Sequence, residues 1–197
     1  MAIKRVIRFP SPSLRLPCKP VAFPLSGEVL EHIGDLRDTL AAVPCGVALA
    51  SNQVAAEGQR LFVVRPGFTG PAVACMASPG GVQEMPEVCI NPAWEAYPPT
   101  ERDFVGIGPL LDEHRSFVEG CLSEPELQLQ VKREMWVQLS YQDLEGRRCE
   151  VVLQGLLARV CQHECDHLRG ILIYDYADKR TQMRAKQDAI RNRKRGR

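Results

Sequence analysis

Apolar residues recur at helical spacing in two stretches of the chain. The first begins after Ser26, a residue type common at helix N-caps, and ends at Pro44. Its apolar positions, three or four residues apart, are Val29, Ile33, Leu36, Leu40 and Val43. The second runs from Gly155 to Arg169, with Gly170 as its stop, and places apolar residues on several faces. We therefore expect an amphipathic surface helix and a central, buried helix.

Other segments have the periodicity of strands or of loops. Apolar and polar residues alternate over 134–142, a turn follows at 143–146, and 147–153 runs back, which predicts a β-hairpin. Short strands are expected at Leu61–Val64 and Val88–Ile90. The Pro-rich segment 1–25 should be irregular, and so should 92–117 and 65–87, the last with room for a short strand near Val73–Met76. So much irregular sequence is typical of a specialised loop region.

Length and composition are those of an ordinary globular protein. The 197 residues suit one buried domain, and 45% hydrophobic and 25% charged residues are average values. No apolar run has the length of a membrane span, and the N-terminus lacks the apolar core of a signal peptide. The eight cysteines are scattered and fit reduced thiols better than disulfides. We expect a cytoplasmic protein with no membrane or DNA partner.

Charge is distributed unevenly along the chain. Residues 179–197 hold nine Lys or Arg against one acid, a charge of +8, so residues 1–178 carry −7. This divides the chain into a single domain over 1–178 and a basic C-terminal tail over 179–197, which is expected to form a surface helix. Such a tail is commonly a solvated end, and the functional alternative is docking to RNA or another anionic surface.

An H-E-x-x-H motif lies in the predicted central helix. His163 and His167 are four residues apart, so both imidazoles lie on one face and can bind a single metal ion. Glu164 can reach a water on the same metal. The alternative is a hydrogen-bonded pair of core histidines. Two histidines and a glutamate in a buried helix need partners, which a metal ion would supply.

Two further stretches carry candidate chemistry. Cys121 follows Gly120, which permits close backbone approach, and its thiolate would be a strong ligand for Zn²⁺ or Fe²⁺. Taken in isolation, one cysteine of eight is weak evidence, and a buried structural cysteine is the more common explanation. Cys161 and Cys165 lie on another side of the predicted helix and fit core packing. In the stretch 46–53, small residues allow a ligand to lie against the backbone, and Gln53 could donate to a developing oxyanion. A tightly packed helix-to-strand loop is the simpler explanation of that stretch alone.

Taken together, these motifs resemble the three signature motifs of peptide deformylases. They read G-x-x-L-A-x-x-Q, E-G-C-L-S and Q-H-E-x-D-H in that order, and the resemblance extends to Phe9–Pro20, Ile90–Pro92 and Gly155–Gln162. It covers most of the chain except about 65–87 and 93–117. The family usually has G-x-G-x-A-A-x-Q in the first motif, where this chain has Ala48 and Ser51 in place of Gly and Ala. Gln128 replaces a basic residue that some members use to bind the substrate backbone.

The resemblance implies an α+β fold with mixed, largely antiparallel sheets packed around the central metal-binding helix. It also implies hydrolytic removal of the N-formyl group from N-terminal formylmethionine of new polypeptides, with release of formate. Cys121, His163 and His167 would hold one divalent metal ion, Fe²⁺ in the cell, with Zn²⁺ or Ni²⁺ as substitutes. Glu164 would transfer protons, and the Gln53 side chain and the Leu122 N–H would stabilise the oxyanion.

The resemblance also assigns residues to substrate binding. Val47, Ala48 and Gly120 would pair with the substrate backbone. Arg133 is the basic residue that remains near Gln128 for substrate binding. Leu156 and Val160 would line the methionine pocket. The partners would be formyl-Met nascent peptides, with the ribosome a candidate through the basic tail, and the protein would be a monomer. The long 65–117 region leaves open a related metal-dependent amide hydrolase, either a peptidase or a deformylase of a non-ribosomal product. A protein with a structural metal would need a fourth protein ligand.

Overall fold

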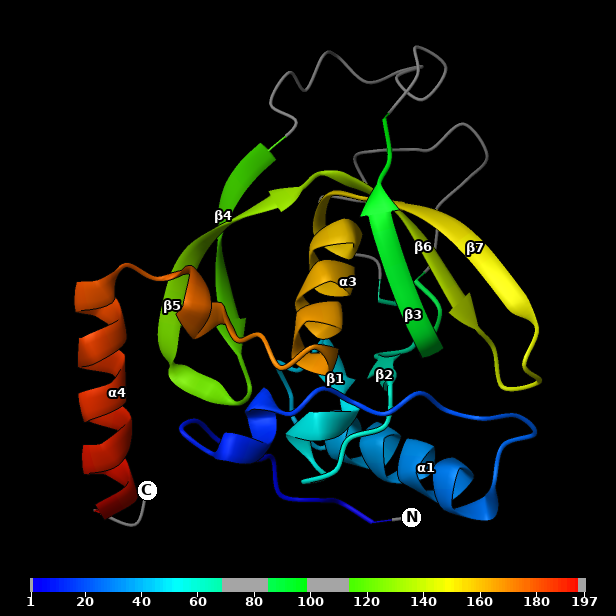
Figure 1. The fold of residues 1–197 in the computed structure, drawn as a ribbon, viewed down its shortest axis with the longest axis horizontal. Helices are drawn as coiled ribbons and strands as arrows, with labels where there is room; N and C mark the ends of the chain where they lie inside the picture. The colour runs from blue at the N-terminus through cyan, green and yellow to red at the C-terminus, as the bar shows by residue number, and fades with distance from the viewer. Residues whose placement is uncertain (1, 69–84, 99–113, 195–197) are drawn as a thin grey trace.

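The computed structural model describes residues 2–68, 85–98 and 114–194, with two sheets enclosing one helix (Figure 1). The strands are β1 (Ala48–Ala50), β2 (Leu61–Val64), β3 (Val88–Ala96), β4 (His114–Cys121), β5 (Glu124–Glu134), β6 (Trp136–Gln142) and β7 (Arg148–Gln154). The α-helices are α1 (Gly27–Ala41), α3 (Gly155–Leu168) and α4 (Lys179–Lys194). The short 3-10 helices within the described residues are η1 (Pro12–Arg15), η2 (Ser51–Gln53) and η4 (Ile173–Tyr176).

Antiparallel pairing organises both sheets. One sheet has the strand order β1-β2-β3-β6-β7, and β4 pairs with β5 in a separate two-stranded sheet. Helix α3 lies between the two sheets (Figure 1). Its Leu157, Ala158 and Leu168 are at most 2% exposed and belong to a core cluster formed with strands of the larger sheet. The predicted central, buried helix is therefore confirmed, and Cys161 and Cys165 pack in the same core.

Helix α1 forms where its pattern predicts. The Ser26 side chain accepts a hydrogen bond from the Val29 N–H at 3.3 Å, which caps the first turn. The apolar face of α1 packs on the far side of β1 and β2, in a second core cluster with Leu49, Leu61 and Val63. This packing fixes the end of α1, and so the start of β1, against the larger sheet.

The hairpin prediction is also confirmed, whereas the expected loop over 92–117 is partly wrong. Strands β6 and β7 pair from Trp136 with Gln154 to Gln142 with Arg148. Strand β3 continues to Ala96, and β4 begins at His114. A register shift between Ile90 and Ala93 accommodates Pro92 in β3, an arrangement that a proline in a strand pattern normally argues against. The expected strand near 73–76 lies outside the described residues.

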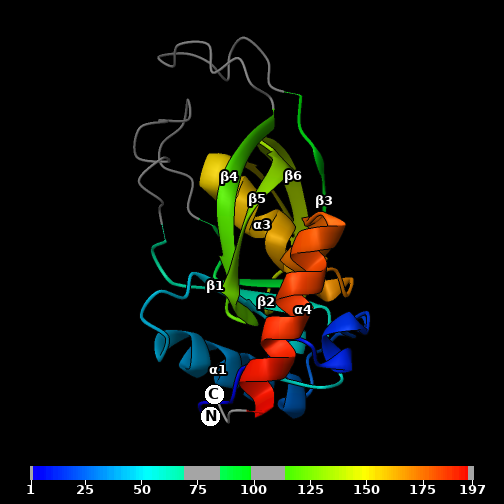
Figure 2. The same cartoon turned by 90° about the vertical axis from the view of Figure 1, so that its left-hand side faces the viewer.

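Helix α4 is the basic tail. Asp178 precedes it and accepts hydrogen bonds from the Arg180 and Thr181 N–H groups at 2.8 and 2.9 Å, which satisfies donors of the first turn. Both views place α4 outside the sheets, beyond β5 (Figures 1 and 2). Among the described residues, none of the helices combines the length and apolar character that a membrane span requires.

Glu124, the first residue of β5, carries a buried carboxyl group. The residue is 4% exposed, and the Tyr174 backbone and the Arg15 charge, which favour its ionised form, do not offset this burial. Burial raises its pKa from 4.5 to about 7. Because folding raises this pKa, the group favours the folded state below pH 4.5, and that contribution is lost as the pH rises toward 7.

Glu124→Gln removes this titration and should change the pH dependence of stability. Relative to the unchanged chain, the variant should gain up to about 3 kcal/mol in free energy of unfolding between pH 5 and pH 8. Urea unfolding gives the free energy of unfolding of each protein at pH 5 and at pH 8. The change between the two pH values is then compared between the variant and the unchanged protein. Glu126→Gln, a change at an exposed neighbour, is the control. If the free energy of unfolding changes between pH 5 and pH 8 by the same amount in the variant as in the unchanged protein, the expectation is contradicted.

Candidate active site

Three metal-ligand side chains converge where β4 ends against α3. The candidate ligand atoms of Cys121, His163 and His167 all lie within 4.8 Å of one another. Cys121 Sγ is 3.2 Å from His167 Nε2, and the two imidazole centroids are 4.9 Å apart. The helix supplies the histidine pair through its own geometry, whereas only the packing of β4 on α3 brings Cys121 to them.

The donor set fits a divalent transition metal. A thiolate and two imidazoles suit Fe²⁺ or Zn²⁺ better than Mg²⁺ or Ca²⁺, which prefer oxygen ligands. The described residues contribute no fourth His, Cys or carboxylate to this group. Three protein ligands would leave a position for water or substrate, as in catalytic zinc sites, whereas a structural zinc site uses four protein ligands.

Glu164 lies beside the first histidine ligand in a dry environment. It is 4% exposed, and its Oε2 has no hydrogen-bond partner among the residues that the structure describes. Burial raises its pKa to about 7, while nearby His163 opposes that rise. A carboxyl group with such a pKa can both accept and return a proton near neutral pH.

The 3-10 turn η2 places Gln53 beside the cysteine ligand. The Gln53 Oε1 accepts a hydrogen bond from the Ala50 N–H at 2.9 Å, so the amide is held by its own turn. Its Nε2 donates to Ser123 Oγ at 3.1 Å and lies 3.7 Å from Cys121 Sγ. Half-buried Leu122 stands between these two residues of the cysteine motif. The first and second motifs are thus in direct contact.

Apart from Arg133 on β5, the predicted substrate-binding positions lie at β1, β4 and α3. Ala48 begins β1, an edge strand of the larger sheet, and Val47 directly precedes it, whereas Gly120 lies near the end of β4. A Cβ built on Gly120 would meet no atom within 4 Å, so open space adjoins the backbone there. Leu156 and Val160 are half-buried on α3, and their spacing places them on the helix face that carries His163.

Glu119, the first residue of the cysteine motif, was given no role in the motif analysis. Its carboxylate accepts hydrogen bonds from His163 Nδ1 at 3.2 Å and from Arg133 Nε and Nη2 at 3.0 Å each. Arg159 of α3 donates to the same carboxylate. Burial opposes ionisation, but the bonds from His163 and Arg133 hold the pKa of Glu119 at about 2. An ionised carboxylate on Nδ1 orients the imidazole and leaves Nε2 for the metal.

Arg133 binds two buried carboxylates, those of Glu119 and Asp166. Besides Glu119, its Nη1 donates to Asp166 Oδ2 at 2.5 Å, and the Tyr176 hydroxyl donates to the same oxygen at 2.7 Å. Arg133 is 5% exposed. The structure therefore places this arginine in a buried ion network behind the histidine ligand. The sequence carried no local signal for this role, because its partners lie on β4, α3 and η4.

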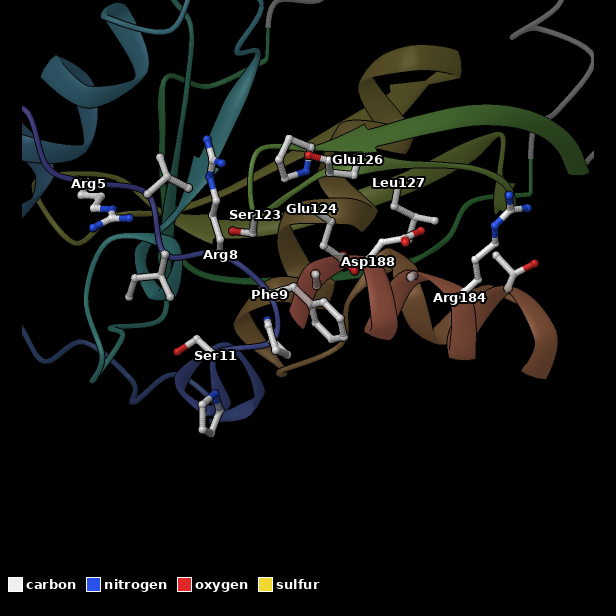
Figure 3. A pocket seen from close by; sticks show the side chains of 18 residues that line it. Arg5, Arg8, Phe9, Ser11, Ser123, Glu124, Glu126, Leu127, Arg184 and Asp188 are labelled. Carbon is white, nitrogen blue, oxygen red and sulfur yellow. The ribbon is translucent and has the colours of Figure 1, made fainter. Parts of the chain in front are cut away.

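A separate pocket of about 860 Å³ lies between the N-terminal segment, the start of β5 and α4 (Figure 3). Its lining includes Ser123 and Glu124 but none of the three metal-ligand residues. The side chains of Arg8 and Arg184 lie on opposite sides of this view. The pocket is therefore distinct from the cluster of candidate metal ligands.

The fold and this site define a metal-dependent hydrolase, and comparison with known proteins identifies the family. The family model described as polypeptide deformylase matches residues 3–183. A peptide deformylase of Stutzerimonas stutzeri is 32% identical over 192 residues, covering 96% of this chain and 97% of the relative. One of Pseudomonas aeruginosa is 34% identical over 188 residues, covering 94% and 95%. The chain belongs to the peptide deformylase family.

Solved structures confirm the expected α+β fold. The crystal structure of peptide deformylase from Thermotoga maritima has 31% identity and a TM-score of 0.68, covering 89% of this chain and 97% of that one. That of a peptide deformylase from Legionella pneumophila has 26% identity and a TM-score of 0.74, covering 100% and 99%. Membership of the family also implies a divalent metal ion.

Glu119→Gln should weaken metal binding while leaving all three ligands in place. The amide keeps the shape of the side chain but loses the charge that orients His163, so affinity should fall about 10- to 100-fold. Competition between the protein and a chelator for Co²⁺ measures this, with circular dichroism confirming that the variant is folded. Glu126→Gln, an exposed change on β5, should keep the original affinity. Unaltered Co²⁺ affinity in a folded Glu119→Gln protein would rule out the orienting role.

Proposed function

We propose that Cys121, His163 and His167 hold one divalent metal ion, at which this chain performs the reaction of its family. That reaction is the hydrolytic removal of the N-formyl group from N-terminal formylmethionine of new polypeptides, with release of formate. The observation that carries the assignment is the convergence of the three motifs, with Glu164 and Gln53 beside the ligand cluster. The comparisons give no support to a related amide hydrolase of another substrate class.

The metal ion would supply Lewis-acid chemistry at its open ligand position, polarising the formyl oxygen and making a bound water more acidic. We propose Fe²⁺ as the physiological ion, with Zn²⁺ or Ni²⁺ as substitutes in purified protein, because the thiolate–imidazole set accommodates all three.

Glu164 acts first as a general base and then as a general acid. Its carboxylate takes a proton from the attacking water and later delivers it to the leaving amine. Burial supports both steps, because a pKa of about 7 makes the group a base strong enough to accept and an acid strong enough to return the proton. The Gln53 Nε2 and the Leu122 N–H donate to the oxyanion as negative charge develops on the formyl oxygen, a contribution typically worth about 3–4 kcal/mol per donor.

The substrate backbone extends along β1 and the end of β4 in this proposal. Val47, Ala48 and Gly120 supply backbone groups, and Leu156 and Val160 line the pocket for the methionine side chain. Arg133 supports Glu119 in place of the substrate contact that the resemblance implied, since its guanidinium is buried in ion pairs. Ala48 stands where the family usually has glycine, and it is 8% exposed and packs in the core cluster that includes Leu157 and Ala158 of α3.

We further propose that the enzyme acts as a cytoplasmic monomer and meets nascent chains at the ribosome through α4. The helix concentrates Lys and Arg at one end of an otherwise acidic chain and lies outside the catalytic core (Figure 2). Ribosomal RNA offers the phosphate surface that such a helix would bind.

Glu164→Gln should retain the metal and lower kcat about 10²- to 10⁴-fold, since the amide cannot transfer the proton. Formate release from formyl-Met-Ala-Ser, together with metal analysis of the same samples, measures both properties. Glu145→Gln, in the exposed hairpin turn, is the matched control and should retain full activity. Turnover near that of the unchanged enzyme, in a fully metallated Glu164→Gln protein, would remove Glu164 from the mechanism.

Deleting residues 179–197 should leave kcat/KM on a short formyl-Met peptide within about twofold and weaken co-sedimentation with ribosomes at low salt. Charge neutralisation within the helix, Arg184→Gln with Lys186→Gln and Arg191→Gln, should reduce binding and flatten its salt dependence, because fewer counterions are released. Equal sedimentation of the full-length, neutralised and truncated proteins would show that the tail is only a solvated end.

A further inference from the structure

Arg65 binds the chain segment that leads from α1 into β1. The residue directly follows β2, and its half-buried guanidinium reaches back to three main-chain carbonyls. Nε donates to Gly46 O at 2.8 Å, and Nη2 donates to Leu40 O at 3.0 Å and Val43 O at 2.6 Å. The Arg65 N–H also donates to Val47 O at 2.8 Å. One residue thus holds four carbonyl groups between positions 40 and 47.

An arginine suits this place for two physical reasons. The last turn of α1 contains no basic residue, so the guanidinium brings positive charge to the negative end of the helix dipole. Its planar fork can serve several acceptors at once, whereas a lysine ammonium offers a single point of charge. The segment is also tightly packed, since a Cβ on Gly46 would lie 2.9 Å from Leu40 Cδ1.

The segment that Arg65 holds leads into β1, the strand whose edge is proposed to bind the substrate backbone. Strand β1 has three residues, pairs with β2 on one side, and lies at the edge of its sheet. An edge strand that receives a peptide backbone binds best when its own backbone is already ordered, because ordering on binding costs affinity.

We propose that Arg65 is a positioning residue for substrate: by fixing the carbonyls of Val43 and Gly46, it presets the edge of β1 on which the substrate backbone pairs. This inference rests on the proposed pairing of Val47 and Ala48 with substrate. Arg65 lies outside the three motifs, twelve residues after Gln53, the last residue of the first motif. The motifs therefore do not account for the contacts that Arg65 makes with the segment before β1.

The test compares a long with a short substrate. In Arg65→Met, KM for formyl-Met-Ala-Ser should rise about tenfold, the equivalent of one or two net hydrogen bonds, with kcat changed less than about twofold. KM for formyl-Met amide, which has no backbone beyond methionine, should change less than about twofold. Arg65→Lys, which keeps the charge but not the fork, should raise KM for the tripeptide by a smaller factor.

Arg60→Met is the matched control. The Arg60 guanidinium also binds a main-chain carbonyl, that of Pro92, but at the opposite end of β2. This variant should leave KM for both substrates unchanged. Hydrogen exchange on the metal-loaded proteins gives a second readout: Arg65→Met should speed exchange of amides in 43–49 and leave those of α3 unaffected.

The outcomes separate the inference from the proposed function. Equal KM changes for both substrates, a fall in kcat with KM constant, or unaltered exchange at 43–49 would each overturn the role of Arg65. If the unchanged enzyme itself binds the tripeptide no better than the amide, the pairing with β1 fails, and the inference fails with it. Length-dependent KM in the unchanged enzyme, with the same KM values in Arg65→Met, would leave the proposed function standing and reject Arg65 alone.

Discussion

The buried carboxylate of Glu119 is the contact on which the geometry of the site depends. An ionised group at 7% exposure is costly unless it is paired, and here it accepts hydrogen bonds from Arg133 on β5 and from Arg159 and His163 on α3. The same group therefore joins the two-stranded sheet to the helix and orients one metal ligand. Cys121 lies two residues further along β4, so its distance from the histidines is set by this junction.

The first motif contacts both the cysteine motif and the metal-binding helix α3. Its turn η2 supplies Gln53, which reaches the cysteine motif, and Asn52, whose Nδ2 donates to the main-chain carbonyl of His167 at 2.6 Å. Three segments far apart in the chain thus meet through direct hydrogen bonds in a buried region. The rigidity needed for catalysis comes from these cross-connections, because each segment alone is short and would not hold its side chain in place.

The sequence predicted the parts of this arrangement that depend on local periodicity. The 3.6-residue repeat located α1 and α3, and the i,i+4 spacing placed both histidines on one helix face. Cys121 could be assigned only through the family resemblance, because no local pattern links a cysteine at a strand end to a distant helix. Strand β5 and the extension of β3 were not predicted, the latter because Pro92 sits at a register shift. The role of Glu119 stayed hidden because its partners meet it only in the folded chain.

The identity of the metal ligands tests the account most directly. X-ray absorption spectroscopy of the Zn²⁺-loaded protein, combined with metal analysis, gives the number of ions per chain and the sulfur and nitrogen atoms around each. The account predicts one ion with a single sulfur at about 2.3 Å and two imidazole nitrogens at about 2.0–2.1 Å. Two or more sulfur ligands, as in a site that recruits Cys161 or Cys165, or a shell without sulfur, would contradict it.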